Sequence, residues 1–455
     1  MSQWTFPVPR TAVSGLKFPA VTDDRAAHLL ALQFQLGQSE WWPAERLRAE
    51  QLRQLGEVLR HASSAVPYYR RRLATAGYRA GQPVTDALLS QLPLLTRSDI
   101  QKAGAALHSV PAFTAHGQLS SGETSGSTGS PISFLSSAME QLYWNAFTLR
   151  EHVWHRRDFA AKLGGIRYTE KNGSASGWGP STNHIFATGP SAALRIDTPL
   201  PRQVEWLLKE KPGYLVSYAS NIEALARDSL RRGWRPEGLR EVRSVSETVR
   251  PELRSLVREA WGLRLVDMYS AKEAGYLALQ CPDHDHYHVQ EENVLLEVLD
   301  GQGRPCAPGE TGRVVVTALH KFAMPLIRYD IGDYAILGEP CSCGRGLGVI
   351  REILGRTRNM MRLPNGDQRW PLCDLVHQPD VPGVMQYQYI QKTLESIEVH
   401  LAVDAQFSRD REPRLTEIIH ARLGHPFALT YVYHDSIPRS ASGKFEDFRC
   451  EIAEA

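Results

Sequence analysis

Apolar and polar residues follow two different periods in the segment 214–269. Short apolar runs at residues 214–218, 242–246 and 264–269 have the length and the residue types of strands. Between them, residues 221–232 and 251–261 carry apolar side chains at helical spacing. This alternation predicts a parallel sheet with helices on its faces. Ligands of such sheets bind beyond the carboxyl ends of the strands, so the turns there are candidate binding sites.

The segment after Gly275 has mainly the pattern of strands. Strand-like runs occupy residues 288–299, 312–319 and 334–337. We expect them to form a strand-rich subdomain beside the parallel sheet.

The first 160 residues predict helices around one hairpin. Residues 1–42, rich in proline and aromatic residues, are expected to be an irregular lead-in. An amphipathic helix is predicted over residues 43–61 and a buried one over 138–155. Between these helices, residues 116–119 and 132–135 alternate like the strands of a hairpin.

The last hundred residues predict a small α+β domain. Strands are expected within residues 387–404 and at 428–433, with a helix over 411–423. The fold class is therefore α/β. We expect a large N-terminal domain, residues 1–355, and a small C-terminal domain, residues 356–455.

The composition argues against several classes of function. The 455 residues are 42% hydrophobic and carry a net charge of +2, so no global field favours nucleic acid or an anionic membrane as a partner. No signal-peptide layout and no membrane-spanning apolar run is visible, which predicts a cytoplasmic protein. Six cysteines are too few for a disulfide framework in a chain of this length.

The connection between the two hairpin strands has a composition suited to phosphate. Its glycines allow close backbone approach, and its hydroxyls and backbone N–H groups can surround phosphate oxygens. No lysine follows the last glycine, so it is not a Walker-type loop. A flexible Gly/Ser linker is the alternative. The proline and the strand directly behind the loop favour the phosphate-binding interpretation.

Several further motifs appear in a fixed order. They are 267–273 (Asp-Met-Tyr-Ser-Ala-Lys-Glu), 328–333 (Arg-Tyr-Asp-Ile-Gly-Asp), 355–356 (Gly-Arg) and 438–444 (Pro-Arg-Ser-Ala-Ser-Gly-Lys). With the loop at 124–131, this series resembles the adenylate-forming ligase superfamily. The segments 66–70 and 92–96 resemble helical signatures of its phenylacetate–coenzyme A ligase branch. The motifs extend over nearly the whole chain.

The resemblance implies a fold and an activity. It implies a large domain that binds ATP and acid, with a small mobile C-terminal lid. The implied reaction activates an aromatic or similar carboxylic acid as its acyl-AMP, with release of pyrophosphate. The acyl group then passes to a phosphopantetheine thiol, either of coenzyme A or of a carrier protein.

The resemblance also assigns roles to residues of this chain. Lys444 is the catalytic cation, Glu273 holds Mg²⁺, Asp333 accepts from the ribose hydroxyls and Arg358 is the hinge pivot. The implied ATP-binding set is Thr124, Ser125, Gly126, Ser127, Thr128, Gly129, Ser246, Glu247, Asp267, Met268, Tyr269, Ser270, Asp333 and Arg356. Three positions depart from the family pattern: Lys272 beside Glu273, Asn359 after the pivot, and Glu123 at the start of the loop.

Cysteine and histidine residues suggest a separate metal site. Cys281 precedes a histidine run at 284–288, and Cys341 and Cys343 form a Cys-x-Cys-Gly turn that can present two sulfurs to one ion. Three cysteines and one histidine would make a closed, structural Zn²⁺ site. His288 is the chosen fourth ligand, and His284 and His286 stay open. The alternative is a set of unconnected buried thiols.

Neither the acid nor the acceptor follows from the sequence. The family's acid pocket implies aromatic lining from Tyr143, Trp144, Phe147, Tyr218 and Met268, although such residues are often ordinary core. One alternative function is an adenylating enzyme that passes the acyl group to an amine. Another is a non-catalytic, zinc-stabilised nucleotide-binding protein.

Overall fold

The computed structural model describes residues 6–124, 131–356, 359–371, 375, 380–440 and 443–452. The chain forms two compact units, Met1–Ile353 and Leu354–Ala455. The functional division predicted between residues 355 and 356 lies close to this boundary. Among the described residues, no helix combines the length and the apolar character needed to cross a bilayer.

The N-terminal lead-in contains a helix that the sequence analysis did not predict. α1 (Asp24–Ser39) begins at Asp23, whose side chain accepts from the Ala26 backbone N–H at 2.8 Å. Its apolar stripe, Ala26, Leu29 and Leu36, is buried. The expectation of irregular structure over residues 1–42 is therefore wrong for this segment.

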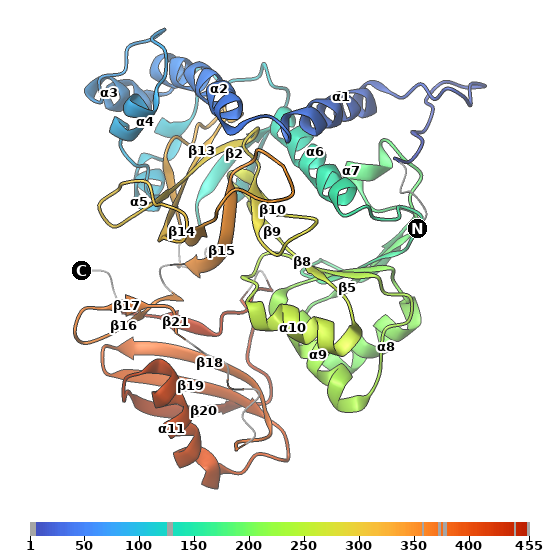
Figure 1. Cartoon of the computed structure of the whole chain (residues 1–455), viewed down its shortest axis with the longest axis vertical. Coiled ribbons are helices and arrows are strands. Elements are labelled where there is room, and N and C mark those ends of the chain that lie inside the picture. Colours follow the sequence, from blue (N-terminus) through green and yellow to red (C-terminus); the bar gives the residue numbers. More distant parts are fainter. Residues whose placement is uncertain are drawn as a thin grey trace. The chain divides into compact units, whose positions relative to one another are not determined.

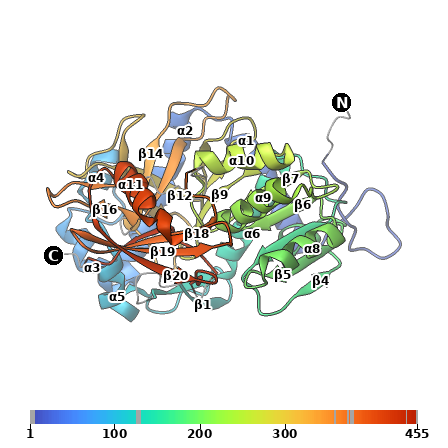
Figure 2. The ribbon, with the colours of Figure 1, turned by 90° about the horizontal axis from the view of Figure 1, so that it is seen from below.

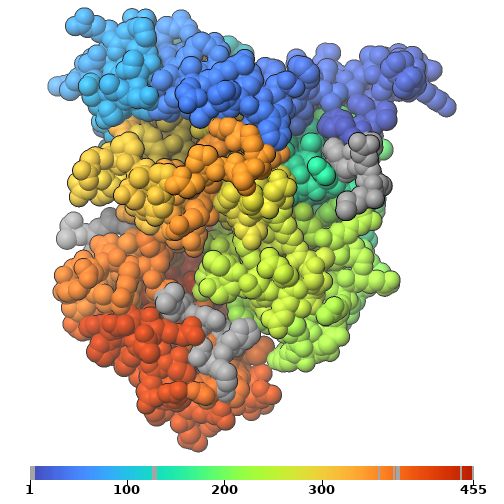
Figure 3. All heavy atoms as spheres, viewed as in Figure 1, coloured from blue at the N-terminus to red at the C-terminus, as the bar shows by residue number. Residues whose placement is uncertain are grey.

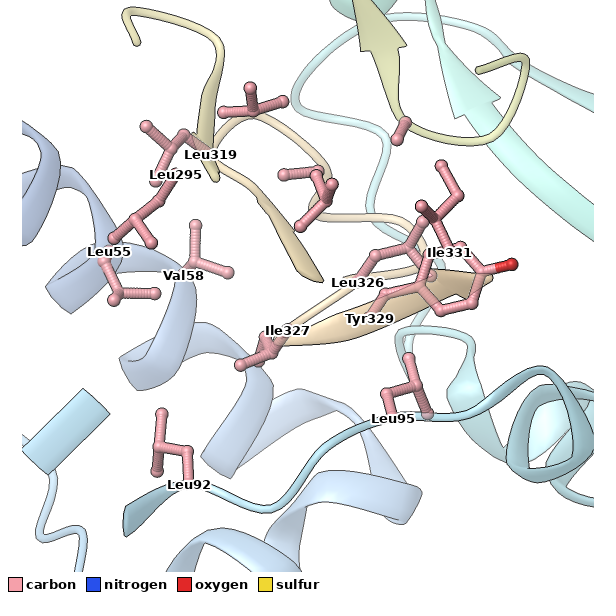
Figure 4. Close-up of a cluster of buried hydrophobic side chains, with 14 of the residues drawn as sticks. Leu55, Val58, Leu92, Leu95, Leu295, Leu319, Leu326, Ile327, Tyr329 and Ile331 are labelled. Atoms are coloured by element: carbon pink, nitrogen blue, oxygen red, sulfur yellow. The ribbon is translucent and has the colours of Figure 1, made fainter. Parts of the chain in front are cut away.

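Four further helices cover one side of the larger sheet. They are α2 (Ala44–Ala65), α3 (Pro67–Thr75), α4 (Asp86–Gln91) and α5 (Arg97–Ala103), followed by a 3-10 turn at Gly104–Leu107. In the space-filling view these blue segments lie directly against the strands in yellow and orange (Figure 3). Figure 4 shows Leu55 and Val58 of α2 facing Leu295 and Leu319 in the main core cluster.

The predicted parallel sheet is confirmed. Its order is β4-β5-β3-β6-β7-β8, and every neighbouring pair except β4–β5 is parallel. α8 (Leu200–Glu210), α9 (Ala219–Arg232) and α10 (Pro251–Trp261) lie along one face (Figures 1 and 2). The strands are β3 (Leu163–Arg167), β4 (Gly173–Ala175), β5 (Ser191–Arg195), β6 (Tyr214–Ser217), β7 (Glu241–Ser244) and β8 (Leu265–Val266).

A seven-stranded sheet forms the strand-rich part of the first unit. Its order is β12-β13-β14-β15-β11-β10-β9, and the neighbours β12–β13, β13–β14, β11–β15, β10–β11 and β9–β10 pair antiparallel. The strands are β9 (Met268–Ala271), β10 (Gly275–Gln280), β11 (Tyr287–Val289), β12 (Val294–Leu299), β13 (Thr311–Ala318), β14 (Tyr329–Leu337) and β15 (Val349–Arg356).

Two predicted strands are each divided in the structure. The run 264–269 separates into β8 and β9, which belong to different sheets, so Asp267 lies at the crossing between the sheets. The run 288–299 separates into β11 and β12 around a turn in which the Asn293 backbone N–H donates to the Gln290 carbonyl at 2.8 Å. At Asp267 a single polar residue separates two apolar runs, so the pattern gives no sign of the bend. At residues 290–293 the four polar residues Gln-Glu-Glu-Asn do mark the break between the two strands.

A hairpin around the candidate phosphate loop is confirmed, but its first strand begins later than predicted, because only Leu119 of the run 116–119 belongs to it. β1 (Leu119–Glu123) pairs antiparallel with β2 (Ser133–Ser137), and α6 (Ala138–Trp154) follows. Ser137 caps α6 in a reciprocal capping box with Glu140. At the open end, the Thr124 N–H donates to the Ile132 carbonyl and the Ile132 N–H donates to the Thr124 hydroxyl, both at 3.0 Å. A short helix, α7 (Pro180–Asn183), packs against α6.

The second unit has the predicted α+β pattern. Its four-stranded sheet has the order β20-β19-β18-β21, and α11 (Glu412–Leu423) lies along it (Figure 1). Leu415 and Ile419 of α11 share a buried core with Tyr389 and Val399 of the sheet. The strands are β18 (Val384–Thr393), β19 (Ser396–Val403), β20 (Ala428–His434) and β21 (Phe448–Cys450), with a separate hairpin of β16 (Met361–Arg362) and β17 (Gln368–Arg369).

Candidate functional site

The structure joins two predicted nucleotide-binding residues through a hydrogen bond. The Tyr269 hydroxyl, on β9, donates to Asp333 Oδ2, on β14, at 2.7 Å. Both side chains are largely buried, at 7% and 9% exposure. The bond fixes one carboxylate oxygen of Asp333, and a carboxylate has further acceptor positions for a diol.

Glu273 lies in the turn between β9 and β10, and its carboxylate lies near a second tyrosine. The Tyr329 hydroxyl donates to Glu273 Oε1 at 3.5 Å, and Glu273 is 6% exposed. Figure 4 shows the Tyr329 ring within the apolar cluster, ending in its hydroxyl. The neighbouring Lys272 is exposed. Both tyrosine–carboxylate pairs therefore link β14 with β9 or the turn after it, although these strands are not adjacent in the sheet order.

The base of the loop hairpin is braced by two cations. The Arg97 guanidinium donates to the Thr124 hydroxyl at 3.3 Å. The buried ammonium of Lys321 donates to the Leu135 carbonyl at 3.0 Å and pairs with Glu140. Ser125, Gly126, Ser127, Thr128 and Gly129 lie outside the described residues. Glu123 accepts from the Ser133 hydroxyl at 3.4 Å, across the hairpin.

The turn after β7 carries two more of the predicted residues. Ser246 adopts a φ of +67°, which a residue with a side chain rarely does outside turns and sites under constraint. Glu247 Oε2 accepts from the Ser220 backbone N–H at 2.8 Å. Met268 and Ser270 belong to β9, where Ser270 pairs with Tyr276 of β10. These positions lie at the carboxyl end of β7 and just beyond that of β8, as the parallel-sheet rule predicts.

Asp267 is buried at the crossing between the sheets. Its Oδ2 accepts from the Tyr287 hydroxyl at 2.7 Å, and its exposure is 3%. Burial raises the pKa of Asp267 to about 6, against the opposing effects of Arg254 and the Tyr287 hydroxyl. We therefore expect the backbone of Asp267 or its neighbours, rather than its carboxylate, to contact the nucleotide.

The raised pKa gives a test of the Asp267 environment. The folded-state pKa of about 6 lies above the ordinary value of 3.8. The contribution of the protonated Asp267 carboxyl to the free energy of unfolding is therefore lost as pH rises through 6. Asp267→Asn keeps an acceptor for Tyr287 and has no charge to desolvate. Its free energy of unfolding, relative to wild type, should rise by about 1 kcal/mol from pH 5 to pH 8. Urea melts at both pH values measure this difference, and a pH-independent difference would contradict it.

In the second unit, the predicted catalytic lysine ends a tight turn. The Lys444 N–H donates to the Ser440 hydroxyl at 3.1 Å, and the Lys444 carbonyl accepts from the Ser440 N–H at 2.9 Å. Gly443 adopts a φ of +79°, which favours glycine. At the other end of the unit, the Arg356 N–H donates to Asn359 Oδ1 at 3.3 Å. Arg358 lies outside the described residues.

A cavity of about 110 Å³ lies between α6, the β1–β2 hairpin and the seven-stranded sheet. Tyr143, Trp144 and Phe147 of α6 line it, as the implied acid pocket requires. Tyr218 and Met268 are not among its lining residues. Polar side chains also line the cavity: Glu140, Lys272, Asn293, His320 and Lys321, with Ser120, Ser136, Ser137 and Gln141.

The cysteine and histidine residues meet in one cluster. One ligand atom from each of Cys281, His286, His288 and Cys341 lies within 4.8 Å of the others. This group of four contains His286 and does not contain Cys343, which the sequence analysis predicted as a ligand. The sulfurs of Cys281 and Cys341 are 3.9 Å apart, and Cys343 Sγ is 3.3 Å from His288 Nε2. Tetrahedral zinc with Zn–S bonds of about 2.3 Å and Zn–N bonds of about 2.0 Å sets these separations at roughly 3.8 and 3.5 Å.

The electrostatics of the cluster suit a cation. Burial raises the pKa of Cys341 to about 12, so its thiolate needs a positive partner. Burial lowers the pKa of His288 to about 3, which keeps the imidazole neutral, its ligand form. His286 Nε2 and His288 Nδ1 are buried without a hydrogen-bond partner among the described residues. His284 instead contacts the Ser342 hydroxyl at 3.0 Å.

Sequence reasoning missed several residues of these sites. Tyr329 stands 56 residues from Glu273, and Arg97 stands 27 residues from Thr124. Tyr329 does follow Arg328 within a motif that was singled out, which is the one signal that could have found it. Nothing local to His320 distinguishes it as a cavity residue.

Comparisons with known proteins agree with this geometry. Residues 376–448 match the family model described as the CapK C-terminal domain. A phenylacetate–coenzyme A ligase of Thermus thermophilus is 29% identical over 394 residues, covering 82% of this chain and 84% of that one. A phenylacetate–coenzyme A ligase of Pseudomonas putida is 24% identical and covers 80% and 83%.

Solved structures give the same result for the fold. A 2-hydroxyisobutyryl-CoA ligase in the postadenylation state superposes with a TM-score of 0.70 at 18% identity, covering 91% of this chain and 92% of that one. An anthranilate CoA ligase in complex with anthranoyl-AMP superposes with a TM-score of 0.51 at 16% identity, covering 71% and 65%. The fold is that of the adenylate-forming ligases. Within that superfamily, the sequence is similar to the phenylacetate–coenzyme A ligases in particular, which confirms the resemblance drawn from the motifs.

Proposed function

We propose that the protein is an AMP-forming acid–thiol ligase that activates a small carboxylic acid with ATP. The observation that carries the proposal is the pairing of Asp333 with Tyr269 and of Glu273 with Tyr329 in one sheet. Both carboxylates are buried, and both lie within the motifs that resemble those of the adenylate-forming ligases. The similarity to coenzyme A ligases over four fifths of the chain supports the same reaction.

The reaction consists of two displacements. A carboxylate oxygen of the acid attacks the α-phosphorus of ATP, and pyrophosphate leaves with the electrons of the broken P–O bond. A thiolate then attacks the carbonyl carbon of the acyl-AMP, and AMP leaves. Both steps depend on positioning and on neutralising negative charge, since the phosphates themselves carry the chemistry.

The residues of this chain take the following roles in the proposal. Asp333, fixed by Tyr269, accepts from the ribose hydroxyls. Thr124 and the loop after it surround the outer phosphates, and Lys444 neutralises the charge that develops between carboxylate and α-phosphate. Glu273 offers the hard oxygen that Mg²⁺ prefers, and the ion would neutralise phosphate charge when bound.

Coenzyme A is the proposed acceptor. The named relatives are coenzyme A ligases, and the same chemistry would serve a phosphopantetheine thiol on a carrier protein. Transfer to an amine is the alternative within the same enzyme class. Supplying each acceptor to preformed acyl-AMP, and identifying the product by mass, separates the three.

Carboxylate-dependent ATP–pyrophosphate exchange over a panel of acids tests the proposal. We expect exchange with at least one small aromatic or branched acid, and thioester formation when coenzyme A is added. ATP binding without exchange for any acid would favour a non-catalytic nucleotide-binding protein instead.

The two nucleotide-site carboxylates should fail in different ways. Asp333→Asn removes an ionised acceptor, so the KM for ATP should rise by about tenfold or more. Glu273→Gln should instead raise the Mg²⁺ concentration needed for half-maximal rate. Initial rates over ATP and Mg²⁺ concentrations measure both effects. Asp330→Asn is the matched control, because Asp330 lies on the same strand but binds the Gly332 N–H and Arg313. Equal effects in all three variants would contradict the assignment.

A structural Zn²⁺ is part of the proposal. Cys281, Cys341 and Cys343 supply three sulfurs, and His288 supplies the imidazole; His286 is the alternative. The sulfur–sulfur and sulfur–nitrogen separations support this set, because they approach the edges of a zinc tetrahedron. Four protein ligands leave no open position, so the ion would stabilise the fold and take no part in the reaction.

A further inference from the structure

The cavity beside α6 contains a histidine with an unusual combination of contacts. His320 follows β13, lines the cavity and stacks on Tyr143 with ring centroids 3.9 Å apart and planes 8° apart. Its Nε2 lies 2.8 Å from the Glu292 backbone carbonyl. A carbonyl can only accept, so Nε2 carries the hydrogen.

The second ring nitrogen is therefore an acceptor. Burial lowers the pKa of His320 to about 4, which leaves the ring neutral near pH 7. With the proton on Nε2, Nδ1 holds an unshared electron pair. No donor from the described residues is found at Nδ1, and the ring forms part of the cavity wall.

The side-chain amide of Asn293 is oriented in the same way as the His320 ring, because its N–H also donates to a backbone carbonyl. Asn293 Nδ2 donates to the Tyr276 carbonyl at 2.9 Å, which fixes the amide so that its oxygen is on the other side. Asn293 is 8% exposed and lines the cavity. An aromatic wall with two acceptors is poorly matched to a plain hydrocarbon ring, because buried acceptors without donors cost free energy.

The size of the cavity limits the ligand. Its volume is about 110 Å³. A cavity of about 150 Å³ in another protein holds benzene, so this smaller, partly open cavity admits at most a single ring or a short branched chain. Long acyl chains and fused ring systems exceed it.

We propose that the acid is a monocyclic or similarly small acid bearing a hydroxyl or amino group, which donates a hydrogen bond to His320 Nδ1. This inference rests on the proposed function, since it names the substrate class of the same site. His320 acts as a specificity-determining residue, and the stacked Tyr143 holds its ring in place. Asn293 offers a second acceptor to the same substituent or to a neighbouring one.

Matched acids test the proposal. Hydroxy- and aminobenzoates and the corresponding phenylacetates are compared with their unsubstituted and methyl-substituted analogues, by pyrophosphate exchange and by calorimetric binding. We expect at least one donor-bearing acid to exceed its unsubstituted and methyl analogues by tenfold or more in kcat/KM and in affinity. Equal or better use of the analogues would overturn the inference and leave the proposed function intact. Selective binding without exchange would support the inference and contradict the proposed function. No binding and no exchange for any acid would overturn both.

Two substitutions assign the preference to His320. His320→Phe keeps a ring against Tyr143 and removes the acceptor, so the tenfold preference for the donor-bearing acid over its unsubstituted analogue should disappear. His320→Gln retains an N–H donor and an acceptor and should restore part of the preference. His184→Phe is the matched control, because His184 contacts Arg25 and is not a cavity residue. A preference that survives in His320→Phe would overturn the assignment, and thermal melting of each variant confirms that it is folded.

Discussion

Replacing Lys444 by alanine is expected to slow acyl-AMP formation by about a hundredfold or more. Its charge is needed as negative charge develops between the attacking carboxylate and the α-phosphate, more than in the ground state. The affinity for ATP should therefore change little. The turn from Ser440 to Lys444 is held through the Lys444 backbone N–H and carbonyl, so alanine preserves it.

Pyrophosphate exchange and ATP binding, measured on the same preparation, check this expectation. Lys392→Ala is the control, because Lys392 lies in the same unit and pairs with Glu398 and Glu451 at the surface. Near-normal exchange in Lys444→Ala would remove Lys444 from the mechanism. A loss of ATP binding as large as the loss of exchange would make it a ground-state contact.

The second large effect concerns the metal cluster. We expect purified protein that has not met a chelator to carry about one zinc ion per chain. Cys343→Ser should release it and lower the free energy of unfolding by at least about 2 kcal/mol, since a closed site contributes its binding energy to folding. Arg345 follows the turn that contains Cys341 and Cys343. Its guanidinium donates to Cys343 Sγ at 3.5 Å and pairs with Glu40 at 3.3 Å. Loss of the metal should therefore loosen contacts with the end of α1.

Metal analysis and chemical unfolding measure both effects. Cys450→Ser is the control, because Cys450 is on β21 in the other compact unit. The KM for ATP should stay within about twofold of wild type in Cys343→Ser at temperatures where it is folded. Absence of zinc in chelator-free protein, or equal destabilisation by both serine variants, would contradict the structural-site account.

The choice between His288 and His286 has its own test. His288→Gln should release the ion if His288 is the fourth ligand, whereas His286→Gln should retain it. The reverse result would exchange their roles, since both rings stand within ligand distance of the cluster.

Regular periods made most of the fold predictable. The helices α6, α9 and α10 and the strands β6, β7 and β13 were predictable because each has either helical apolar spacing or the residue types of a strand over its length. α1 was missed because the prolines and aromatic residues around it were weighted above the apolar stripe of Ala26, Leu29 and Leu36. The bend at Asp267 was missed because both strands it separates are apolar, and only the pairing of each strand with a different sheet reveals it.

The sequence predicted the site residues that lie within motifs. It did not predict the residues that contact them from distant parts of the chain. The motifs predict both Glu273 and Asp333 in strand-end turns, which is correct for Glu273, whereas Asp333 lies within β14. The tyrosines that hold them, Tyr329 and Tyr269, act across 56 and 64 residues of chain. His286 enters the metal cluster and His320 the cavity wall through the same kind of long-range packing, which leaves no local signal.

The fate of the carboxylate oxygens tests the central claim most directly. The acid, labelled with oxygen-18 in its carboxylate, is incubated with ATP, Mg²⁺ and coenzyme A, and the nucleotide product is analysed by mass spectrometry. Attack of the carboxylate on the α-phosphorus predicts AMP that carries one labelled oxygen for each thioester formed. Unlabelled AMP, or ADP as the nucleotide product, would contradict the acyl-adenylate route and with it the proposed function.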